Sequence, residues 1–390
     1  MPVSAASFMT HSASSRETGR NLARQLQAAF REPPALVVTY LTVNHDQQGF
    51  LEGLGDVLGR EIAVVGCSTQ GVVGRGFIRE EGYAAGVMGL GGAGVSVSNG
   101  VVHDIPVDTF EKGRALGRTI RQGLPSEPSA VVLHYDALCG VDPDRLLEGL
   151  FRELGCPILG GAAAHSFSYQ ALRETYVYHG TQVATRAAVG FGMCGDFRVE
   201  IAHAHGCSPA GVELTVTRAK DNLLFELDGA RASDVWEEIC GDISTLSSQV
   251  TALAIGVPQP GSDQYLVRSA YSIDPETGAI VLGPAIPEGT KIMLHHRSIE
   301  EVLEGSRRMS EALAARLAGR AARAVFGFEC GARTRPFLGD EATLAENLGV
   351  QRAVAGEPAW IGMFPWGELV PVAGKPAFHN YAYSLLVLAD

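Results

Sequence analysis

Reactive and polar side chains follow two apolar runs near the end of the chain. The runs, residues 324–329 and 358–364, have the composition of buried strands and end in glycine-rich turns. Because α/β proteins place their sites where strands end, the side chains at these turns are the first candidates for chemistry. They are Cys330, Arg333, Trp366 and Glu368.

Arg333 and Glu368 have the charges that a free amino acid requires. If both face one cleft, Arg333 could hold a carboxylate through two hydrogen bonds while Glu368 accepts hydrogen bonds from an ammonium group. The alternative is that the two side chains pair with each other or face water, as most charged residues do.

Cys330 is a candidate nucleophile, since glycine and arginine follow it and a nearby cation lowers the pKa of a thiol. The base would be His379, provided that the two strands are neighbours. The alternative is a small buried thiol.

Two further strand ends belong to the candidate site. The segment VVGCSTQG, residues 64–71, places Cys67, Ser68 and Thr69 where backbone N–H groups and hydroxyls could hold a carboxylate. The alternative is that these hydroxyls satisfy their own backbone. In ILGGAAA, Gly160 and Gly161 would let the backbone approach a ligand closely.

Metal and nucleotide motifs are weak. His203, His205 and Cys207 alternate, so on one strand they would face the same side and suit zinc, copper or a haem iron. The glycine and proline around Cys207 indicate that the strand ends first, so we predict no metal site. The run GLGGAG, residues 89–94, matches a dinucleotide fingerprint formally, but a β-type run follows it, and we predict a glycine-rich hairpin.

Composition excludes several classes of protein. A chain of 390 residues, 46% apolar and 19% charged, suits a soluble α/β protein with a large core. The net charge of −12 argues against nucleic acid or an anionic membrane as partner. Seven scattered cysteines indicate reduced thiols. Neither a signal sequence nor an 18-residue apolar run is present, so we expect a cytoplasmic protein.

The elements that position these residues alternate between strands and helices. Almost wholly apolar strands separated by amphipathic helices predict parallel pairing with both faces covered. Capping-box spacing begins helices at Ser14 and Ser298, and turn chemistry at Asp274 to Gly278 predicts a hairpin. The expected elements are helices at 15–31, 46–59, 109–123, 142–155, 230–241 and 298–319, a meander at 83–105 and a strand-rich stretch at 175–227.

One pattern occurs twice. Val65-Gly66 to Gly71 and Ile361-Gly362 to Gly367 share an apolar residue, a glycine, four residues and a second glycine. This spacing would suit a duplicated strand-to-turn element facing a common cleft. Residues 242–262 have little pattern and are a plausible domain boundary.

The motifs in this order resemble the FIST family of bacterial sensory proteins, from about Ala35 to the end. They are VVGCSTQG, ILGGAAA, the segment from Gly206 to Gly229, and the two C-terminal turns with the following His-Asn. The resemblance implies an N-terminal helical region (1–34), a FIST N-terminal domain (35–229) and a FIST C-terminal domain (230–390). The expected fold is α/β (mixed α+β), with a largely buried mixed sheet covered by helices in each domain and a ligand cleft at strand carboxyl ends.

The family implies a cytoplasmic sensor that binds a small, amino-acid-like ligand without a cofactor and signals through a protein partner such as a histidine kinase. Its candidate ligand-binding residues are Cys67, Ser68, Thr69, Gly160, Gly161, Cys330, Arg333, Trp366, Glu368 and His379. Two alternatives stay open: a haem-binding nitric-oxide sensor using His203 or His205, and a hydrolase or transferase with Cys330 or Thr69 as nucleophile. The chain departs from the family pattern at Val72, where a glutamate is usual, and at Pro365, where a hydroxyl residue is common, and both changes alter the polar lining.

Overall fold

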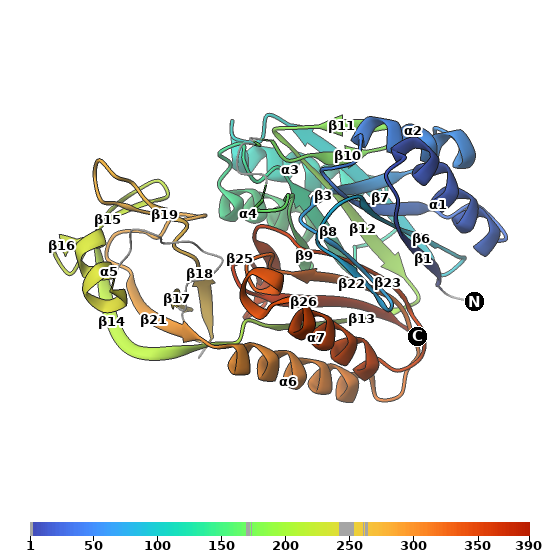
Figure 1. Cartoon of the computed structure of the whole chain (residues 1–390). Coiled ribbons are helices and arrows are strands. Elements are labelled where there is room, and N and C mark those ends of the chain that lie inside the picture. Colours follow the sequence, from blue (N-terminus) through green and yellow to red (C-terminus); the bar gives the residue numbers. More distant parts are fainter. Residues whose placement is uncertain (1–2, 169–171, 173, 242–252, 260, 262–263) are drawn as a thin grey trace.

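The computed structural model describes residues 3–168, 172, 174–241, 253–259, 261 and 264–390 (Figure 1). The chain folds as three repeats of one pattern: strand, helix, strand, helix, strand, hairpin, strand. A separate domain is inserted after the first strand of the third repeat. We call the three repeats together the body, and the inserted domain the insert.

The first two repeats have the same order of elements. Repeat 1 consists of β1 (Ser4–His11), α1 (Ser15–Ala29), β2 (Leu36–Thr42), α2 (Gln47–Leu58), β3 (Val64–Thr69), β4 (Val72–Gly74), β5 (Phe77–Arg79) and β6 (Ala84–Gly91). Repeat 2 consists of β7 (Val95–His103), α3 (Thr109–Gln122), β8 (Ala130–Tyr135), α4 (Pro143–Leu154), β9 (Ile158–Ala162), β10 (Val177–His179), β11 (Gln182–Ala184) and β12 (Ala187–Gly195).

The third repeat is interrupted by the insert. Repeat 3 consists of β13 (Arg198–Ala204), α6 (Ile299–Leu317), β22 (Ala322–Glu329), a π-helical turn (Thr334–Leu338), α7 (Asp340–Ala353), β23 (Ala359–Met363), β24 (Glu368–Val372), β25 (Lys375–His379) and β26 (Tyr383–Ala389). The insert consists of β14 (Cys207–Lys220), β15 (Leu223–Leu227), β16 (Ala230–Arg231), α5 (Ala232–Cys240), β17 (Leu253–Pro258), β18 (Tyr265–Arg268), β19 (Ser272–Ile273), β20 (Ile280–Val281) and β21 (Lys291–Arg297).

The repeats are joined by exchanged hairpins. Each body sheet has six strands, four from one repeat and two from the hairpin of another: the orders are β1-β6-β2-β3-β10-β11, β7-β12-β8-β9-β24-β25 and β13-β26-β22-β23-β4-β5. Repeat 2 completes the sheet of repeat 1, repeat 3 that of repeat 2, and repeat 1 that of repeat 3. The exchange is therefore cyclic, and no repeat completes its sheet alone.

The register of the strands shows which positions correspond in the three repeats. The central parallel pair of each sheet sets Gly66, Gly160 and Gly362 opposite Thr39, Leu133 and Gly327 respectively. A Cβ at Gly66 or Gly160 would come within 1.8 or 2.0 Å of the facing carbonyl oxygen, so glycine is required there. The duplication seen in the sequence is thus part of a threefold repeat.

Helices cover the outside of the body and the sheets enclose its core. Tyr40, Val132 and Phe326, one from each repeat, belong to one central apolar cluster. The helix pairs α1–α2, α3–α4 and α6–α7 each pack on their own sheet over a separate outer cluster. The predicted class, mixed sheets covered by helices, is confirmed.

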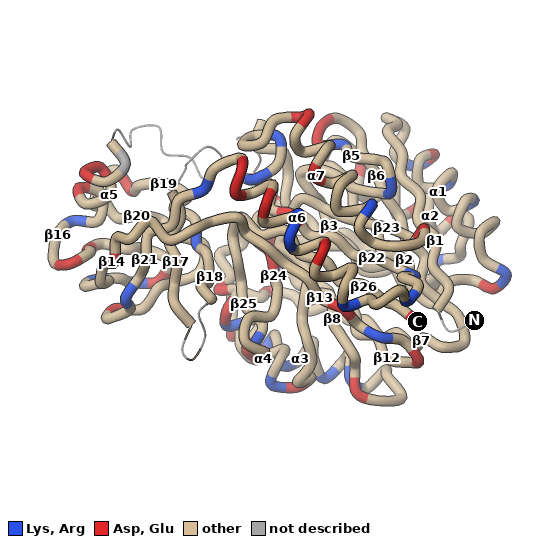
Figure 2. Tube along the Cα trace, turned by 90° about the horizontal axis from the view of Figure 1, so that it is seen from below, with Lys and Arg blue, Asp and Glu red and all other residues tan. Residues whose placement is uncertain are grey.

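The insert lies beside the body, at the left in Figure 1. Its strands form one further sheet, β18-β17-β21-β14-β15-β20-β19, with β16 beside β15, and α5 packs on it through Trp236. In Figure 2, acidic and basic positions are interspersed along the outer helices and loops, whereas the strands through the body are mainly uncharged. Among the described helices, none has the length and apolar character needed to cross a membrane.

Several local predictions need correction. The meander at 83–105 is wrong, because β6 and β7 belong to different sheets, and GLGGAG connects these sheets without forming a hairpin. Ser14 begins α1 without a side-chain cap, whereas Ser298 accepts a hydrogen bond from the Glu301 amide as its capping box predicts. The hairpin at Asp274 is confirmed, since its turn joins the antiparallel strands β19 and β20, whereas the preceding β18 pairs with β17. Of the expected boundary at 242–262, residues 242–252, 260 and 262 lie outside the described residues.

Candidate functional site

The strand end at Cys67, Ser68 and Thr69 belongs to β3, which packs in the central apolar cluster of the body. The hydroxyl of Tyr40 is 3.1 Å from Nε2 of His134, and the ring of Phe328 is 6.0 Å from that histidine. These three residues occupy equivalent positions in their repeats. Beside them, the Cys67 sulfur is 3.5 Å from that of Met363, and burial raises the pKa of the Cys67 thiol. Cys67 is therefore part of the packed core.

The hydroxyls of the same strand end satisfy backbone groups. Ser68 Oγ accepts a hydrogen bond from the Tyr176 amide at 3.0 Å. Thr69 Oγ1 donates to the Gly71 carbonyl at 2.8 Å and accepts from the Phe364 amide at 3.0 Å. This is the backbone-satisfying alternative that the sequence left open.

Gly160 and Gly161 permit close contact between parts of the body. Gly160 has a φ of +136° and lies against the Leu133 carbonyl. Gly161 pairs with Glu368 across the β9–β24 ladder, and a Cβ there would meet the ring of Pro365 at 2.5 Å. Both glycines join repeat 2 to the hairpin of repeat 3.

A cavity of about 590 Å³ lies between the body and the insert. Repeat 2 contributes Tyr135, parts of the loop between β8 and α4, and Phe167. Strands β8, β22 and β23 all direct their carboxyl ends toward it. Of the predicted residues, the structure places two in its lining, Cys330 and Trp366.

Aromatic rings form much of the cavity wall. The rings of Trp366 and Phe167 stack at a centroid distance of 5.3 Å with an interplanar angle of 14°. The ring of His165 meets Trp366 edge-on at 4.4 Å. Phe378 also lines the cavity, and the Arg268 guanidinium lies 5.4 Å from its ring centroid.

Polar residues of the insert are fixed to the body at the cavity. The Asn380 side chain accepts from the Ser269 amide at 3.0 Å and donates to the Tyr271 hydroxyl at 3.0 Å. Ser269 Oγ lies 2.5 Å from the hydroxyl of Tyr381. Arg268 pairs with Asp144 of α4 at 2.9 Å and donates to the Phe378 carbonyl. These contacts tie β18 of the insert to both repeats that line the cavity.

Sequence reasoning missed these insert residues. The sequence shows Asn380 and Tyr381 directly after the predicted His379, which was the available signal. Nothing in the sequence indicates that 269–271, more than a hundred residues earlier, pack against them.

Glu368 is buried next to the cavity wall. Its Oε2 accepts a hydrogen bond from the Ala382 amide at 3.0 Å, and its Oε1 has no partner among the described residues. Burial raises the pKa of Glu368 to about 8, while the Ala382 amide and the Cys330 thiol partly oppose this rise. At neutral pH the side chain is therefore mainly protonated. The equivalent position of repeat 1 holds Val72.

Cys330 itself is a poor candidate nucleophile. Burial, and then the neighbouring Glu368, raise the pKa of its thiol well above the ordinary value. His379 faces Glu368 in the β24–β25 ladder, and neither of its ring nitrogens has a hydrogen-bond partner among the described residues. The expected thiol–imidazole pair is thus not formed.

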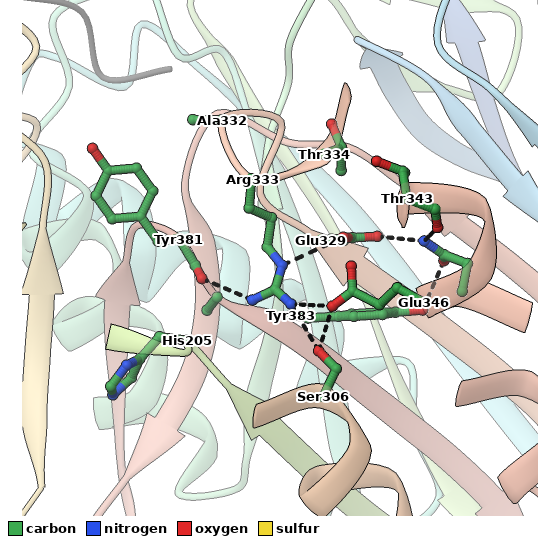
Figure 3. A network of polar contacts seen from close by, with 12 residues as sticks. His205, Ser306, Glu329, Ala332, Arg333, Thr334, Thr343, Glu346, Tyr381 and Tyr383 are labelled. Atoms are coloured by element: carbon green, nitrogen blue, oxygen red, sulfur yellow. Dashed lines mark hydrogen bonds and ion pairs between the residues drawn. The ribbon is translucent and has the colours of Figure 1, made fainter. Parts of the chain in front are cut away.

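Arg333 lies outside the cavity lining and is fully buried. Figure 3 shows its polar contacts. Its guanidinium is paired with Glu346 and lies 3.4 Å from Glu329; it also donates to Ser306 Oγ at 2.7 Å and to the Tyr381 carbonyl at 3.2 Å. Burial disfavours the cation, but the two glutamates outweigh it and raise the pKa of Arg333.

Asn347 and Tyr383 extend this buried network. Asn347 donates to Glu329 at 2.8 Å and accepts from the Tyr383 hydroxyl at 2.9 Å. Burial, and then Glu346, raise the pKa of Glu329 well above the usual range. One arginine and two carboxylates therefore reach near neutrality by retaining a proton. The charge of Arg333 is therefore balanced by Glu329 and Glu346 inside the protein, which is the pairing alternative to a ligand role.

The histidines of the metal alternative do not assemble a site. Strand β13 ends at Ala204, and His205 Nδ1 accepts from the Cys207 amide at 3.0 Å, so the alternation stops there. The rings of His203 and His379 are 6.0 Å apart. Burial lowers the pKa of all three histidines. Within the described residues no group of three potential ligands could hold a metal ion.

Comparison with known proteins gives two matches along the chain. A family model described as the FIST N domain matches residues 35–230, and one described as the FIST C domain matches residues 232–371. An uncharacterized protein of Mycobacterium tuberculosis is 27% identical over 379 residues, 92% of each chain. An uncharacterized protein of Mycobacterium bovis is 29% identical over 248 residues, 60% of this chain and 61% of the relative, so that match spans less than two thirds of its length.

Among solved structures, cyanuric acid hydrolase from A. caulinodans aligns with a TM-score of 0.38 and 10% identity over 98% of this chain and 99% of the other. Phosphoribosylformylglycinamidine synthase II from Thermotoga maritima aligns with a TM-score of 0.24 and 11% identity, over 99% and 72% respectively.

Proposed function

The chain belongs to the FIST family, whose domains imply a role in sensing and signal transduction, and from this premise we propose that it senses a small ligand bound in the cavity between body and insert. The observation that carries the proposal is the cavity itself. Its volume of about 590 Å³ lies in the range of small-molecule sites. Its wall combines aromatic rings with a few fixed polar groups, as such sites do.

We propose that the bound state is passed to a protein partner, such as a histidine kinase, through the position of the insert. Arg268, Ser269 and Asn380 join the two parts at the cavity wall. A ligand between them would contact both sides of this junction. Ligands that bind between two parts of a protein stabilise one relative position of those parts.

The site favours binding over catalysis. A cysteine nucleophile needs its thiolate form, and the surroundings of Cys330 favour the thiol. Thr69 uses its hydroxyl in backbone hydrogen bonds. Alkylation of the native protein followed by peptide mass spectrometry tests this: Cys330 should react no faster than Cys67. Preferential labelling of Cys330 would support the enzyme alternative.

The described residues do not fit a haem in this cavity. A haem iron needs an axial ligand such as an imidazole or a thiolate. The described lining contains no histidine, and its one cysteine favours the protonated form. An absorption spectrum of protein from cells supplied with a haem precursor should lack a Soret band. A band at stoichiometric haem would instead direct attention to His203 and His205.

A thermal-shift screen tests the proposed function. Free amino acids and a diverse set of neutral fragments are added to the wild type and to Val281→Phe, a variant that fills part of the cavity from β20. Ligands of the cavity should raise the melting temperature of the wild type and have little effect on the variant. Equal shifts in both proteins would place binding elsewhere and contradict the proposal.

A further inference from the structure

The cavity wall carries no charged side chain in the described part of the chain. Its polar side chains are amides, hydroxyls, an indole and a thiol. The nearby Arg268 is paired with Asp144, and Arg333 with its two glutamates. Arg297 lies outside the lining, over the ring of Tyr381 at 3.9 Å, and donates to the Ala332 carbonyl. An ionised ligand would lose its hydration here without gaining a counter-ion in the lining, which is costly.

The helix that borders the cavity does not offer an anion site either. Pro143, the first residue of α4, lines the cavity, and the N-terminus of a helix attracts anions. However, the Asp142 carboxylate accepts hydrogen bonds from the amides of Asp144 and Arg145 at 3.0 and 3.3 Å. The Asp142 carboxylate therefore occupies the N-terminus of α4, where a ligand anion would otherwise bind.

The aromatic side chains favour a flat ring. Tyr135, Phe167, Tyr271, Trp366, Phe378 and Tyr381 line the cavity, whereas Phe, Trp and Tyr make up 7% of the chain. The rings of Phe167 and Trp366 form a nearly parallel stack. Aromatic pairs gain stability beyond burial of their area, so a planar ligand is favoured over an aliphatic one of equal size.

The hydroxyl of Tyr271 is the polar group of the lining that can donate a hydrogen bond to a ligand. The Tyr271 oxygen accepts from Asn380, so its own proton remains for an acceptor, and burial raises the pKa of Tyr271, which keeps that proton in place. The indole N–H of Trp366 also has no partner among the described residues, but its nitrogen is buried, so it does not face the cavity. A ligand with an acceptor such as a carbonyl oxygen would therefore take its hydrogen bond from the Tyr271 hydroxyl.

We infer that the ligand is an uncharged aromatic or heteroaromatic molecule that carries a hydrogen-bond acceptor. This inference rests on the proposed function, because it concerns the same cavity. It differs from the amino-acid-like ligand in charge and in shape.

Three molecules with one ring system separate charge from shape: naphthamide, naphthoate and naphthamidine. Their affinities for the full chain are measured by saturation-transfer NMR and calorimetric titration, with Val281→Phe as control. We expect naphthamide to bind at least about tenfold more tightly than the anion or the cation, a difference of about 1.4 kcal/mol. Binding should be lost in the control.

The other outcomes separate the two proposals. If naphthoate or naphthamidine binds as tightly as naphthamide, and Val281→Phe removes that binding, the ligand class is wrong and the cavity is still a binding site. If none of the three distinguishes the wild type from Val281→Phe, the cavity does not bind such rings and the inference is overturned, whereas the proposed function is decided separately by the thermal-shift screen.

A charge added to the cavity wall tests independently whether the uncharged lining selects an uncharged ligand. Leu138 lines the cavity and is 42% exposed, so Leu138→Lys should fold. The variant should bind naphthoate several-fold more tightly than the wild type does, with Leu138→Met unchanged. An unchanged affinity for naphthoate would show that charge in the wall does not select the ligand, which would overturn the inference.

Discussion

Ser306 donates a hydrogen bond of 2.6 Å to Oε1 of Glu346, at the place where α6 crosses α7. The other two repeats cross their helices through glycines. A Cβ at Gly53 would lie 2.1 Å from the Arg16 carbonyl, and one at Gly149 would lie 2.0 Å from the Phe110 carbonyl. Repeat 3 thus has two polar side chains where repeats 1 and 2 have close backbone contact, and the buried Arg333 is paired there.

The buried network around Arg333 lies next to the cavity and fixes the position of residues in the cavity wall. Arg333 donates to the carbonyl of Tyr381, and Tyr381 and Ala332 both line the cavity. The other side of the network is made by α6 and α7, which lie on the outside of the body. Repeat 3 thus differs from the other repeats by buried polar residues: Glu346 lies at the helix crossing, where they have glycine, and Glu368 lies where repeat 1 has Val72.

Replacing Arg333 by methionine should destabilise the protein strongly. The change leaves Glu329 and Glu346 buried without a cation, and breaking a buried ion pair costs about 3–5 kcal/mol. Equilibrium unfolding in urea measures the loss. Arg316→Met, which removes an ion pair with Glu200 at the surface, should cost less than about 1 kcal/mol.

Adding Glu329→Gln and Glu346→Gln to Arg333→Met should recover most of that stability, because the buried charges are then gone together. A single Arg333→Met variant as stable as Arg316→Met would contradict the role assigned to the network.

The glycine crossing of repeat 1 makes a second prediction. Gly53→Ala should destabilise the protein by about 1–3 kcal/mol, since its Cβ would clash with backbone of α1. Gly55→Ala on the same helix is the matched control. Its nearest neighbour would be the Thr181 methyl group at 3.4 Å, and alanine gains helix propensity of about 1 kcal/mol over glycine. Equal effects of the two substitutions in thermal unfolding would show that the helices do not cross at Gly53.

Glu368 predicts a fall in stability as the pH rises. Its pKa of about 8 in the folded state lies above the ordinary value of 4.5. Between these values the folded protein binds a proton that the unfolded chain has released, so the free energy of unfolding decreases with pH by up to about 1.4 kcal/mol per unit. The contribution is fully present below about pH 4.5 and is lost by about pH 8.

Glu368→Gln should remove this part of the pH dependence, because the amide oxygen still accepts from Ala382 and carries no charge. Urea unfolding at several pH values between 5 and 8 compares the two proteins. The free energy of unfolding of the wild type should fall relative to that of the variant as the pH rises. Glu329, whose pKa is raised, and buried histidines such as His134 and His205, whose pKa is lowered, contribute slopes of opposite sign to both proteins and cancel in the difference. Parallel curves for the two proteins would mean that Glu368 is ionised in the folded state.

The sequence predicts local elements well and their pairing poorly. The sequence predicts the helix after Ser298 because Ser298 and Glu301 have the spacing of a capping box, and the Glu301 amide does donate to Ser298 Oγ. The pairing of β6 and β7 was mispredicted because adjacent strands usually pair, whereas here the chain passes from one repeat to the next between them. The exchange of hairpins is set by contacts between distant repeats, which one sequence does not show.

The candidate site was predicted in part for the same reason. Strand ends at Cys330 and Trp366 do line the cavity, since parallel strands direct their carboxyl ends to one edge. Arg333 follows the same strand end, but its side chain turns to Glu346, which lies on the next helix. The prediction that Arg333 holds a ligand carboxylate requires its side chain to face the cavity, and the structure shows that it does not. Gly53 and Gly149 lie in helices that the sequence predicts, but their equivalent role at the helix crossings is evident only when the repeats are aligned.

The junction between insert and body makes the last prediction. Arg268 is 3% exposed, pairs with Asp144 and donates to the Phe378 carbonyl. Arg268→Met should loosen this junction, and hydrogen exchange should become faster in β18 and β25, where the Asn380 amide is bonded to the Val267 carbonyl. Asp144→Asn keeps the arginine and its carbonyl contact, so its effect should be smaller. If Arg268→Met leaves exchange in both strands unchanged, the insert is held by its other contacts, and the position of the insert is not set by Arg268.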